Sequence, residues 1–453
     1  MVDDALGDLT SLDRDVARGY RALSQWRADL IKDLAASADE APLEAVRHVA
    51  GKSTWAALAA LVPTEADAPL RDALKRWVFV LTQARIGLPL EVSRARAASE
   101  QRGVFQGEAA RRVSWIEAWR GVAAARTVAE TQLWLEAAAE VASEVAAANR
   151  LRAERRVEVA RRLGADHPWS PILPLDRSAL RAAGERLLDR TDDVAAAVRS
   201  QGPSAGQGPS AVIHQAMARD AGEGWPAHVT SHWLEEAFGK GTRGLRLELS
   251  PLPTARGASS FARALVAFGF AVRVASSPSG MPFALAHDPA FVSAHRLGFV
   301  FGALSADARW QERTLRIGRR TALAQSIVLT RSALLEARLL AARLLLGDDT
   351  AFAPPDRFSE LGVRLFGREL DGRLRGAWPP AREDEPARFV ALLQALPFAE
   401  RLREQFDLDW YRNPRAWEYL HAMAAAPAIE PVDASAFAGQ VEGLARTLEG
   451  VLG

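Results

Sequence analysis

Two histidines one helical turn apart have the spacing in this sequence that is most suggestive of a catalytic site. His228 and His232 lie in "GWPAHVTSHWLEEAF", and Glu235 and Glu236 follow directly. Side chains four residues apart share one face of a helix, so two imidazoles there can bind a tetrahedral zinc ion. A carboxylate from Glu235 or Glu236 would supply the third ligand. The four residues are therefore a candidate metal site.

The position that would hold the catalytic base of such a site is occupied by Val229. Zinc hydrolases with an H-E-x-x-H motif use the Glu after the first histidine to activate metal-bound water. A site without that carboxylate could hold a metal and still lack hydrolytic chemistry. We therefore interpret His228 and His232 as two polar residues of a helix, and keep a zinc-dependent hydrolase as the alternative.

A second candidate site combines aromatic and basic side chains in "DLDWYRNPRAWEYL". Aromatic rings interleaved with guanidinium groups can stack on a ligand or on a partner protein. The Asn-Pro step in the middle is equally compatible with a turn that packs back on the body of the protein. Both interpretations stay open for the residues concerned, which are Trp410, Tyr411, Arg412, Arg415 and Trp417.

Two further groups of polar residues have simpler explanations as helix caps. The Asp288-Pro289 step is typical of a helix start, so we predict that Asp288 caps a helix with His287 and His295 beside it. The acidic doublets Asp192-Asp193 and Asp348-Asp349 lack a further acid three residues later, and we place them at helix ends.

Composition excludes several classes of function. The formal net charge is +1, so no overall field attracts nucleic acid or an anionic membrane. The absence of cysteine removes disulfides, thiolate metal sites and cysteine nucleophiles. The sequence also has no phosphate-binding glycine loop, no G-x-S-x-G and no dinucleotide-binding fingerprint. We therefore expect neither a nucleic-acid partner nor one of these enzyme classes.

The chain has no segment that reads as a signal peptide or a membrane span. Its N-terminus is acidic and lacks the basic and apolar regions of a signal peptide. The most apolar long stretch, residues 322–346, carries four charges, which favours a buried helix with a narrow polar stripe. We expect a cytoplasmic protein that does not bind membranes.

Apolar residues at helical spacing dominate the first half of the sequence. Residues from about 106 to 163 suit one or two long amphipathic helices, and a further helix is expected at 177–199. The Gly-, Pro- and Ser-rich segment 200–211 predicts a loop or linker. This segment would separate an N-terminal helical bundle, residues 1–199, from a mainly helical C-terminal domain, residues 212–453.

The C-terminal part contains the clearest strand pattern. Leu245, Leu247 and Leu249 alternate with polar residues, which is typical of a half-buried strand. After it, Ser259 or Ser260 can cap the helix "SSFARALVAFGFAVRVA". Further helices are expected at 288–304, 307–346, 356–366, 386–404 and 433–451. The predicted fold class is mainly α, a large helical body with a small β element around 244–275.

The order of these features resembles the thimet oligopeptidase and oligoendopeptidase F metallopeptidases. The resemblance implies a clamshell-like helical bundle that closes over a channel. In that family, a helix after a small sheet carries an H-E-F-G-H-A-type stretch, and a downstream Glu completes the zinc site. Here "VAFGFAV" keeps the Phe-Gly-x-Ala frame. It places Val266 and Phe270 at the histidine positions and Ala267 at the position of the catalytic Glu.

Val and Phe cannot bind zinc, and Ala cannot act as a base. The resemblance therefore implies a metallopeptidase-like fold with no catalytic residues and no cofactor. On this basis we expect a non-catalytic pseudoenzyme, or helical binding protein, that holds a peptide or protein partner between its halves. A zinc-dependent hydrolase built on His228 and His232, and a structural subunit that assembles through tryptophan-rich faces, are the alternatives.

Overall fold

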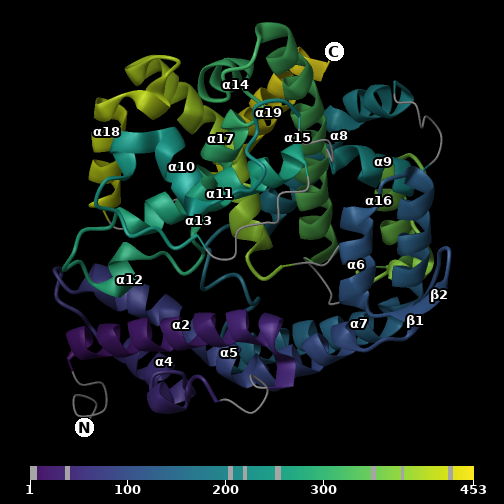
Figure 1. Ribbon diagram of the computed structural model, residues 1–453. Helices are drawn as coiled ribbons and strands as arrows, with labels where there is room; N and C mark the ends of the chain where they lie inside the picture. Colours follow the sequence, from purple (N-terminus) through teal and green to yellow (C-terminus); the bar gives the residue numbers. More distant parts are fainter. Residues whose placement is uncertain are drawn as a thin grey trace.

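The computed structural model describes residues 8–35, 41–201, 208–217, 222–249, 257–347, 354–378, 382–426 and 432–452. Within these ranges lie seventeen α-helices and one two-stranded antiparallel sheet, which confirms the predicted mainly α class. Figure 1 shows the N-terminal helices as a layer along the bottom of the view, with the later helices above it. Short 3-10 helices join them at Glu44–Val46, Gly239–Thr242, Gly372–Leu374, Trp410–Arg412 and Ala434–Ala436.

The bottom layer has its own apolar core. It is built by the helices α2 (Leu9–Lys32), α4 (Lys52–Ala60) and α5 (Ala68–Ser99). Its centre holds the buried rings of Trp26 and Trp77. The short helix α12 (Phe283–Ala286) closes this core from above, because the carboxylate of Asp13 accepts hydrogen bonds from its first backbone N–H groups. Trp77 Nε1 also donates to the backbone oxygen of His287 at 2.9 Å. The first layer is thus joined to the later part of the chain.

A β-hairpin occupies the start of the region predicted to be entirely helical. It is followed by two helices, and the four elements are β1 (Gly103–Gln106), β2 (Ala110–Val113), α6 (Trp115–Ala124) and α7 (Val128–Arg162). The ring of Phe105 in β1 stacks on Trp134 of α7 at 3.8 Å between centroids. The side chain of Ser114 and that of Glu117 form a capping box that starts α6. The two helices were predicted, whereas the hairpin was not.

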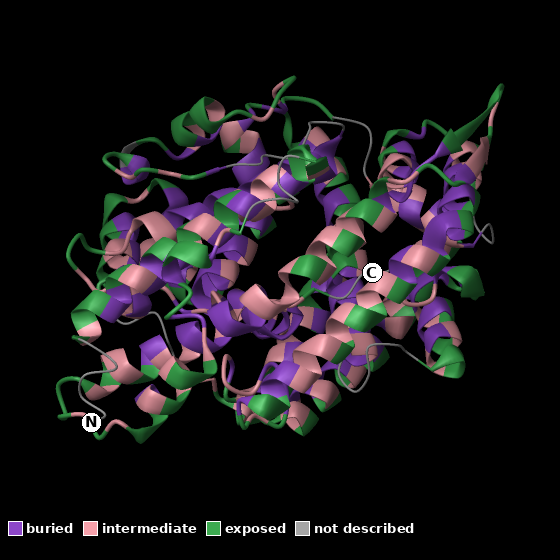
Figure 2. Cartoon of the chain, turned by 90° about the horizontal axis from the view of Figure 1, so that it is seen from below, coloured by how far each residue is buried: buried purple, intermediate pink, exposed green. Residues whose placement is uncertain are grey.

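The largest core lies between α7 and a group of later helices. These are α8 (Arg177–Ser200), α9 (Pro209–Ala216), α15 (Arg319–Gly347), α16 (Pro355–Phe366), α17 (Glu385–Phe406) and α19 (Phe437–Leu452). Leu187 of α8 and Leu340 of α15 both belong to it. Residues before and after the predicted linker 200–211 therefore share one core. Residues 202–207 lie outside the described residues. Figure 2 shows buried residues concentrated on the faces that the helices turn toward one another.

A third core is built by α10 (Ser231–Phe238), α11 (Ala258–Ala275), α13 (Val292–Leu304), α14 (Ala308–Thr314) and α18 (Pro414–Ala424). Helix α11 is long and apolar enough to cross a membrane by length and composition alone. However, 56% of this stretch is buried against other helices, as expected of a core helix. The apolar helix α15 is buried as predicted mainly in its C-terminal part, where Arg338 is 1% exposed. In its first half, Leu323, Ile327 and Val328 are exposed.

The small β element was predicted in the wrong place. Residues 244–249 are not part of a sheet, residues 250–256 lie outside the described ranges, and 258–275 is helical. The alternation reports burial correctly, because Leu249 is buried and Leu245 and Leu247 are half-buried against the third core. A strand also requires a hydrogen-bonded neighbour, which such an alternation does not reveal.

The helices expected at 288–304, 307–346, 356–366, 386–404 and 433–451 are present, with errors at their ends. Helix α9 begins inside the segment 200–211 that was predicted as a loop or linker, and helix α18 was not predicted. The expected helix 307–346 is divided into α14 and α15 near Arg316, whose φ of 58° interrupts the helical backbone. Neither Ser259 nor Ser260 caps α11, because the helix begins at Ala258 and both serines lie inside it. The hydroxyl of Ser259 donates to the backbone oxygen of Met217. The N-cap position of α11 is Gly257.

Candidate functional site

Helices α11 and α13 approach each other so closely that three glycines are needed at their contact. A Cβ on Gly269 would lie 2.5 Å from the backbone oxygen of Leu297, and one on Gly298 would lie 2.8 Å from that of Val266. A Cβ on Gly302 would lie 2.5 Å from Val266 Cγ2. The side chain of Val266 therefore packs against the backbone of α13. This is the position at which the resemblance places the first zinc histidine.

The other two positions of the motif are also occupied by apolar packing. The ring of Phe270 lies 5.5 Å from that of Phe291 and 5.1 Å from the imidazole of His295. Ala267, like Phe270, is half-buried. Zinc in proteins is held by nitrogen, oxygen or thiolate ligands, and the side chains of Val266, Ala267 and Phe270 have none of these atoms. The residues present at this face do not fit a zinc ion.

A polar residue in contact with this face is His295, near the start of α13. Its Nε2 lies 3.3 Å from Asp384 Oδ2, and its side chain is 14% exposed. Burial lowers the pKa of His295, an effect that Asp384 partly offsets. Burial alone would raise the pKa of Asp384. The hydrogen bond from His295 and the charge of Arg382 outweigh this effect and hold that pKa well below its usual range.

Asp288 lies just before α13, whose N-cap position is Phe291 and not Asp288 as predicted. The carboxylate of Asp288 accepts hydrogen bonds from the backbone N–H groups of Ala290 and Val292, at 3.0 and 3.2 Å. Burial raises the pKa of this carboxyl to about 6. His287 lies at the end of α12, and burial lowers the pKa of its imidazole to about 4. The two histidines of this segment thus lie on different elements and do not form one site.

The start of α17 holds three consecutive carboxylates, and each one binds a different part of the molecule. Asp384 binds His295 of α13, and Glu385 accepts from Arg343 Nε of α15 at 2.8 Å. Glu383 lies against the bottom layer and α7. In Figure 1, α2, α5 and α7 run below α13 and α17, so Glu383 connects the two levels of the molecule.

Glu383 is surrounded by arginines from two helices. Arg152 Nη2 lies 2.5 Å from its carboxylate, Arg156 Nε lies 3.7 Å away, and Arg27 Nη2 lies 3.8 Å away. Arg27 also forms a bidentate pair with Glu91 of α5, with nitrogen–oxygen distances of 2.5 and 2.9 Å. We call the group formed by these five residues and the neighbouring Arg94 the Glu383 centre.

The Glu383 centre is enclosed by protein but still reached by water. Burial alone would raise the pKa of Glu383. The charges of Arg156, Arg152 and Arg27 outweigh this effect and hold that pKa well below its usual range. For the arginines burial acts in the other direction, and it lowers the pKa of Arg156 and of Arg94. The side chains of Glu383 and Arg27 nevertheless remain 36% exposed. Water can therefore reach part of this charged group.

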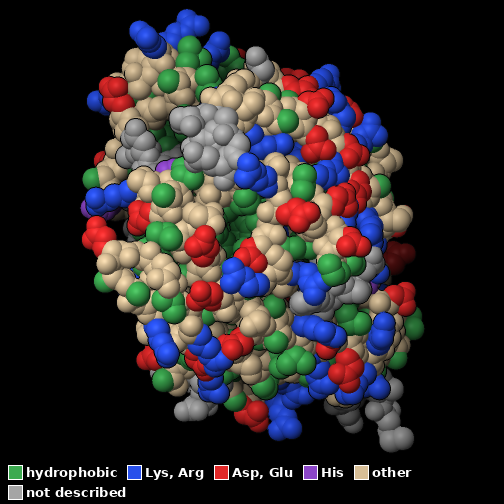
Figure 3. Space-filling view, turned by 90° about the vertical axis from the view of Figure 1, so that its right-hand side faces the viewer, with side chains coloured by type: hydrophobic (Ala, Val, Ile, Leu, Met, Phe, Trp, Pro, Cys, Tyr) green, Lys and Arg blue, Asp and Glu red, His purple; other side chains and the backbone are tan. Residues whose placement is uncertain are grey.

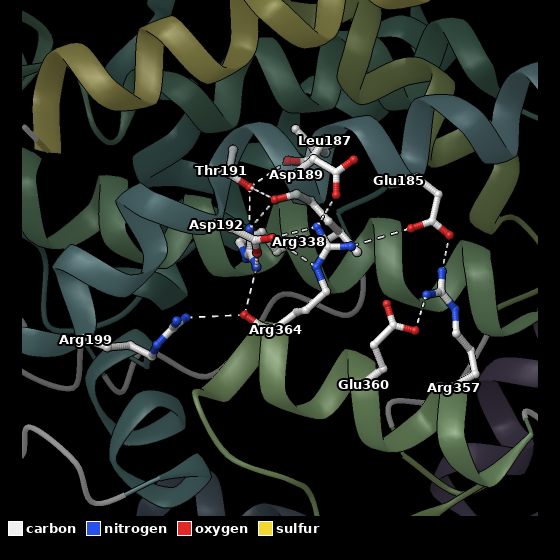
Figure 4. A network of polar contacts seen from close by, with 11 residues as sticks. Glu185, Leu187, Asp189, Thr191, Asp192, Arg199, Arg338, Arg357, Glu360 and Arg364 are labelled. Carbon is white, nitrogen blue, oxygen red and sulfur yellow. Dashed lines mark hydrogen bonds and ion pairs between the residues drawn. The ribbon is translucent and has the colours of Figure 1, made fainter.

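A second ion network, shown in Figure 4, joins α8, α15 and α16. Asp192 pairs with Arg338 at 2.5 Å and with Arg364 at 2.7 Å. Arg338 also donates to two backbone oxygens, those of Leu188 and Arg364. Both oxygens of Asp192 are therefore occupied by arginines, which gives this carboxylate a structural role. Its place in the middle of α8 corrects the predicted helix end, while Asp348 and Asp349 lie outside the described residues.

The two predicted metal-binding histidines do not share a helical face. Helix α10 begins at Ser231, so His228 lies before it and only His232, Glu235 and Glu236 belong to it. His232 is 81% exposed, and its Nε2 lies 3.7 Å from Glu236 Oε1. Among the described residues, no group of three or more His, Asp and Glu side chains is placed to hold a metal ion.

The aromatic residues of the second candidate site lie in the third core. Trp410, Tyr411 and Trp417 are at most 3% exposed, and Trp417 Nε1 donates to the backbone oxygen of Tyr411 at 3.0 Å. Only Arg412 and Arg415 are exposed. The ring faces are thus occupied by packing, and the interpretation as a turn that packs on the body is the one that the burial supports.

Sequence reasoning missed the Glu383 centre. Two patterns could have indicated parts of it. Asn149, Arg152 and Arg156 share one face of α7 by their spacing, and "REDEP" places three acids at a helix start, where carboxylates are favourable. Neither pattern predicts that the two segments meet. Elsewhere charges of both signs are interspersed, as Figure 3 shows for one face, in keeping with the net charge of +1.

Comparison with known proteins gives a fold. No protein-family model and no curated protein matches the chain. Among solved structures, PZ peptidase A with an inhibitor matches with a TM-score of 0.55 and 10% identity, over 88% of this chain and 83% of the other. A protein described as an oligoendopeptidase F from Bacillus anthracis str. Ames matches at 0.57 and 11%, over 88% and 82%.

A second protein described as an oligoendopeptidase F matches with a TM-score of 0.54 and 12% identity, over 98% of this chain and 96% of the other. These matches span nearly the whole length of both chains, which confirms the resemblance proposed from the sequence. At this level of identity they show the fold alone. The chain has a metallopeptidase-like fold, similar to that of the oligoendopeptidase F and PZ peptidase structures.

Proposed function

We propose that this protein is a non-catalytic member of the metallopeptidase-like fold that binds a peptide or protein partner, and that it acts in the cytoplasm. The observation that carries the proposal is the packing of Val266 against Gly302 at the contact of α11 and α13. A zinc peptidase needs two metal ligands and a base on this helix, according to the resemblance. Here the same face contributes van der Waals contact between helices.

Two features support binding over a purely structural role. The fold is that of proteins described as peptidases, over nearly their whole length. In addition, Glu383 and Arg27 stay 36% exposed where the bottom layer meets α17. Charged side chains at this contact between the bottom layer and α17 offer hydrogen-bond donors and acceptors. Such groups can bind the polar backbone or the charged ends of an extended peptide.

The proposal is tested by separating binding from cleavage. The purified chain is incubated with a mixture of short unstructured peptides, with and without added zinc, and the peptides are analysed by mass spectrometry. We expect intact peptides in both samples, and a subset of them to co-elute with the protein on a sizing column. Cleavage that requires zinc would show that the chain is an enzyme, and the proposal would be wrong.

The zinc-hydrolase alternative makes a specific prediction in the same assay. Cleavage would have to be lost when His228 and His232 are both replaced by alanine. The assembly alternative requires exposed tryptophan-rich faces, and Trp410 and Trp417 are at most 3% exposed. No observation on the described residues favours either alternative over peptide binding.

A further inference from the structure

The Glu383 centre contains more positive than negative groups. Four guanidinium groups, those of Arg27, Arg94, Arg152 and Arg156, lie around the carboxylates of Glu91 and Glu383. Two positive charges are therefore not compensated by these carboxylates. Charges that are removed from bulk water are unfavourable unless they are paired. The arrangement therefore favours a bound anion.

The uncompensated charge can be assigned to two of the four arginines. Arg27 and Arg152 form short ion pairs with Glu91 and Glu383. Arg156 makes a single ion pair with Glu383, at 3.7 Å. Arg94 donates from Nε to Asn149 Oδ1 at 2.7 Å, and no carboxylate of the described residues lies within ion-pair distance of it.

The donors of these two arginines lie on neighbouring helix faces. Asn149 and Arg156 lie two turns apart on one face of α7, and Arg94 of α5 reaches that face through its hydrogen bond to Asn149. The positive charge of Arg152, one turn from Arg156, acts on both Arg94 and Arg156. These like charges repel one another, and an anion bound next to Arg152 would be attracted by all three guanidinium groups.

The centre is also accessible. The side chains of Arg152 and Arg156 are 21% and 18% exposed, and those of Arg27 and Glu383 are 36% exposed. In the Asp192 network, by contrast, Arg338 is 1% exposed and donates to protein oxygens on three sides. The Glu383 centre therefore combines water access with more arginines than carboxylates. The Asp192 network is also partly exposed, since the side chain of Asp192 is 40% exposed, but its arginines are matched by the carboxylates of Asp192, Asp189, Glu185 and Glu360.

We propose that Arg94 and Arg156, supported by Arg27 and Arg152, form a subsite for an oxyanion, the carboxylate or phosphate group of a ligand. Guanidinium groups bind both kinds of oxyanion through pairs of parallel N–H···O hydrogen bonds. Glu383 lies at the edge of the subsite and competes with the ligand for Arg156. The identity of the ligand as a peptide rests on the proposed function, while the binding of an anion does not.

The test uses inorganic phosphate as the probe, measured by isothermal titration calorimetry at constant ionic strength with chloride as the balancing ion. Constant ionic strength is needed because general screening would otherwise weaken every charge interaction at once. We expect saturable binding to the wild type. In the double variant Arg94→Gln with Arg156→Gln, we expect binding to be at least about tenfold weaker, which corresponds to the loss of about one charge-assisted hydrogen bond.

Two further variants make the result specific. Glu383→Gln removes the competing carboxylate, so phosphate should bind several-fold more tightly, a gain that a misfolded variant cannot produce. The matched control is the double variant Arg150→Gln with Arg162→Gln. These two arginines lie on the exposed side of the same helix and pair with Glu154 and Glu158. This control should leave phosphate binding unchanged. Equal binding in the wild type and in the Arg94/Arg156 variant, or no saturable binding at all, would overturn the proposal.

A competition experiment separates the subsite from the proposed function. Two peptides of one sequence, with a free and with an amidated C-terminus, are added to the phosphate-bound protein. Displacement of phosphate by the free acid alone would identify a peptide carboxylate as the natural anion. If phosphate binds through Arg94 and Arg156 but neither peptide displaces it, the oxyanion subsite stands, and the failure counts against the proposed peptide binding.

Discussion

The α11–α13 contact and the Glu383 centre are neighbours, but they are built in opposite ways. His295 of α13 lies between them, because its ring packs on Phe270 and its Nε2 binds Asp384. On one side of it, glycines bring two backbones together around Val266. On the other side, arginines and carboxylates remain accessible to water around Glu383.

The difference shows where chemical groups lie in this chain. The helix that the resemblance assigns to zinc carries packing, and its glycines are needed for close approach. The partly buried charges lie beyond His295, on Arg152 and Arg156 of α7 and on Glu383 at the start of α17. A fold can keep its shape while its polar groups are placed elsewhere, so function has to be argued from the site rather than from the fold. Four variants can break or sharpen this comparison.

The largest effect is expected at the closed contact. In Gly302→Ala, the new Cβ would lie 2.5 Å from Val266 Cγ2, so overpacking should reduce the free energy of unfolding by about 1–3 kcal/mol. Val266→Ala in the same chain removes the clashing methyl groups and should restore part of the loss. Denaturation in urea measures both variants. The control is Gly439→Ala in α19, where no atom lies within 4 Å of the new Cβ, and the change should be neutral or stabilising. An additive double variant would show that Val266 and Gly302 are not in contact.

The second effect is a pH dependence at the boundary between the two levels. The pKa of His287 in the folded protein, about 4, is below the usual value of 6.5, because burial disfavours the charged ring. Its contribution to stability is therefore present above pH 6.5 and is lost as the pH falls from 6.5 to 4. For this half-buried group we expect a loss of about 1–2 kcal/mol.

Asp288, whose pKa is raised to about 6, acts in the opposite direction over nearly the same range. The measured quantity is therefore the difference between wild type and His287→Gln in unfolding free energy at pH 7 and at pH 4.5. Relative to wild type, the variant should gain stability on acidification. An unchanged difference at the two pH values would contradict the burial of the imidazole as the cause.

The third effect is expected at the Glu383 centre. Glu383→Gln leaves the guanidinium groups of Arg152 and Arg156 without their shared carboxylate. Because the side chain is about a third exposed, we expect a loss of about 1 kcal/mol instead of the 3–5 kcal/mol typical of a fully buried pair. The pKa of Glu383 is depressed from the usual 4.5, so this contribution is present above pH 4.5 and lost as the pH falls below it. Thermal unfolding of wild type and variant should therefore converge in acid; a gap that persists there would contradict an ionic origin.

The smallest effect is expected for Arg94→Gln combined with Arg156→Gln. Since neither arginine makes a short ion pair, the change in unfolding free energy should stay within about 0.5 kcal/mol, and removal of mutual repulsion can offset what is lost. Chemical denaturation without phosphate is the measurement. A loss as large as that of Gly302→Ala would mean that these arginines stabilise the fold, and the contrast between the two regions would disappear.

The sequence was sufficient for the helices because their apolar spacing is local. It was sufficient for the resemblance because "VAFGFAV" and the order of elements lie along one chain. The prediction from the sequence was wrong at 244–249, where the alternation of leucines with polar residues indicated a strand. The leucines are buried or half-buried there, but the segment forms no strand. The Glu383 centre could not be predicted, because Arg27, Arg152 and Glu383 are far apart in the chain and like many surface charges in type. Only the approach of α2, α7 and α17 gives them a shared environment.

The central claim is that the face of α11 bearing Val266, Ala267 and Phe270 contributes packing and does not hold a metal. The most direct test is the zinc content of the purified chain, measured by mass spectrometry of the elements after dialysis against zinc and then against buffer. We predict far less than one zinc per chain, unchanged in Val266→Ala and in the double variant His228→Ala with His232→Ala. One zinc per chain that survives dialysis would contradict the account. If that zinc were lost in the histidine variant, the metal site first suggested by the sequence would be the correct one.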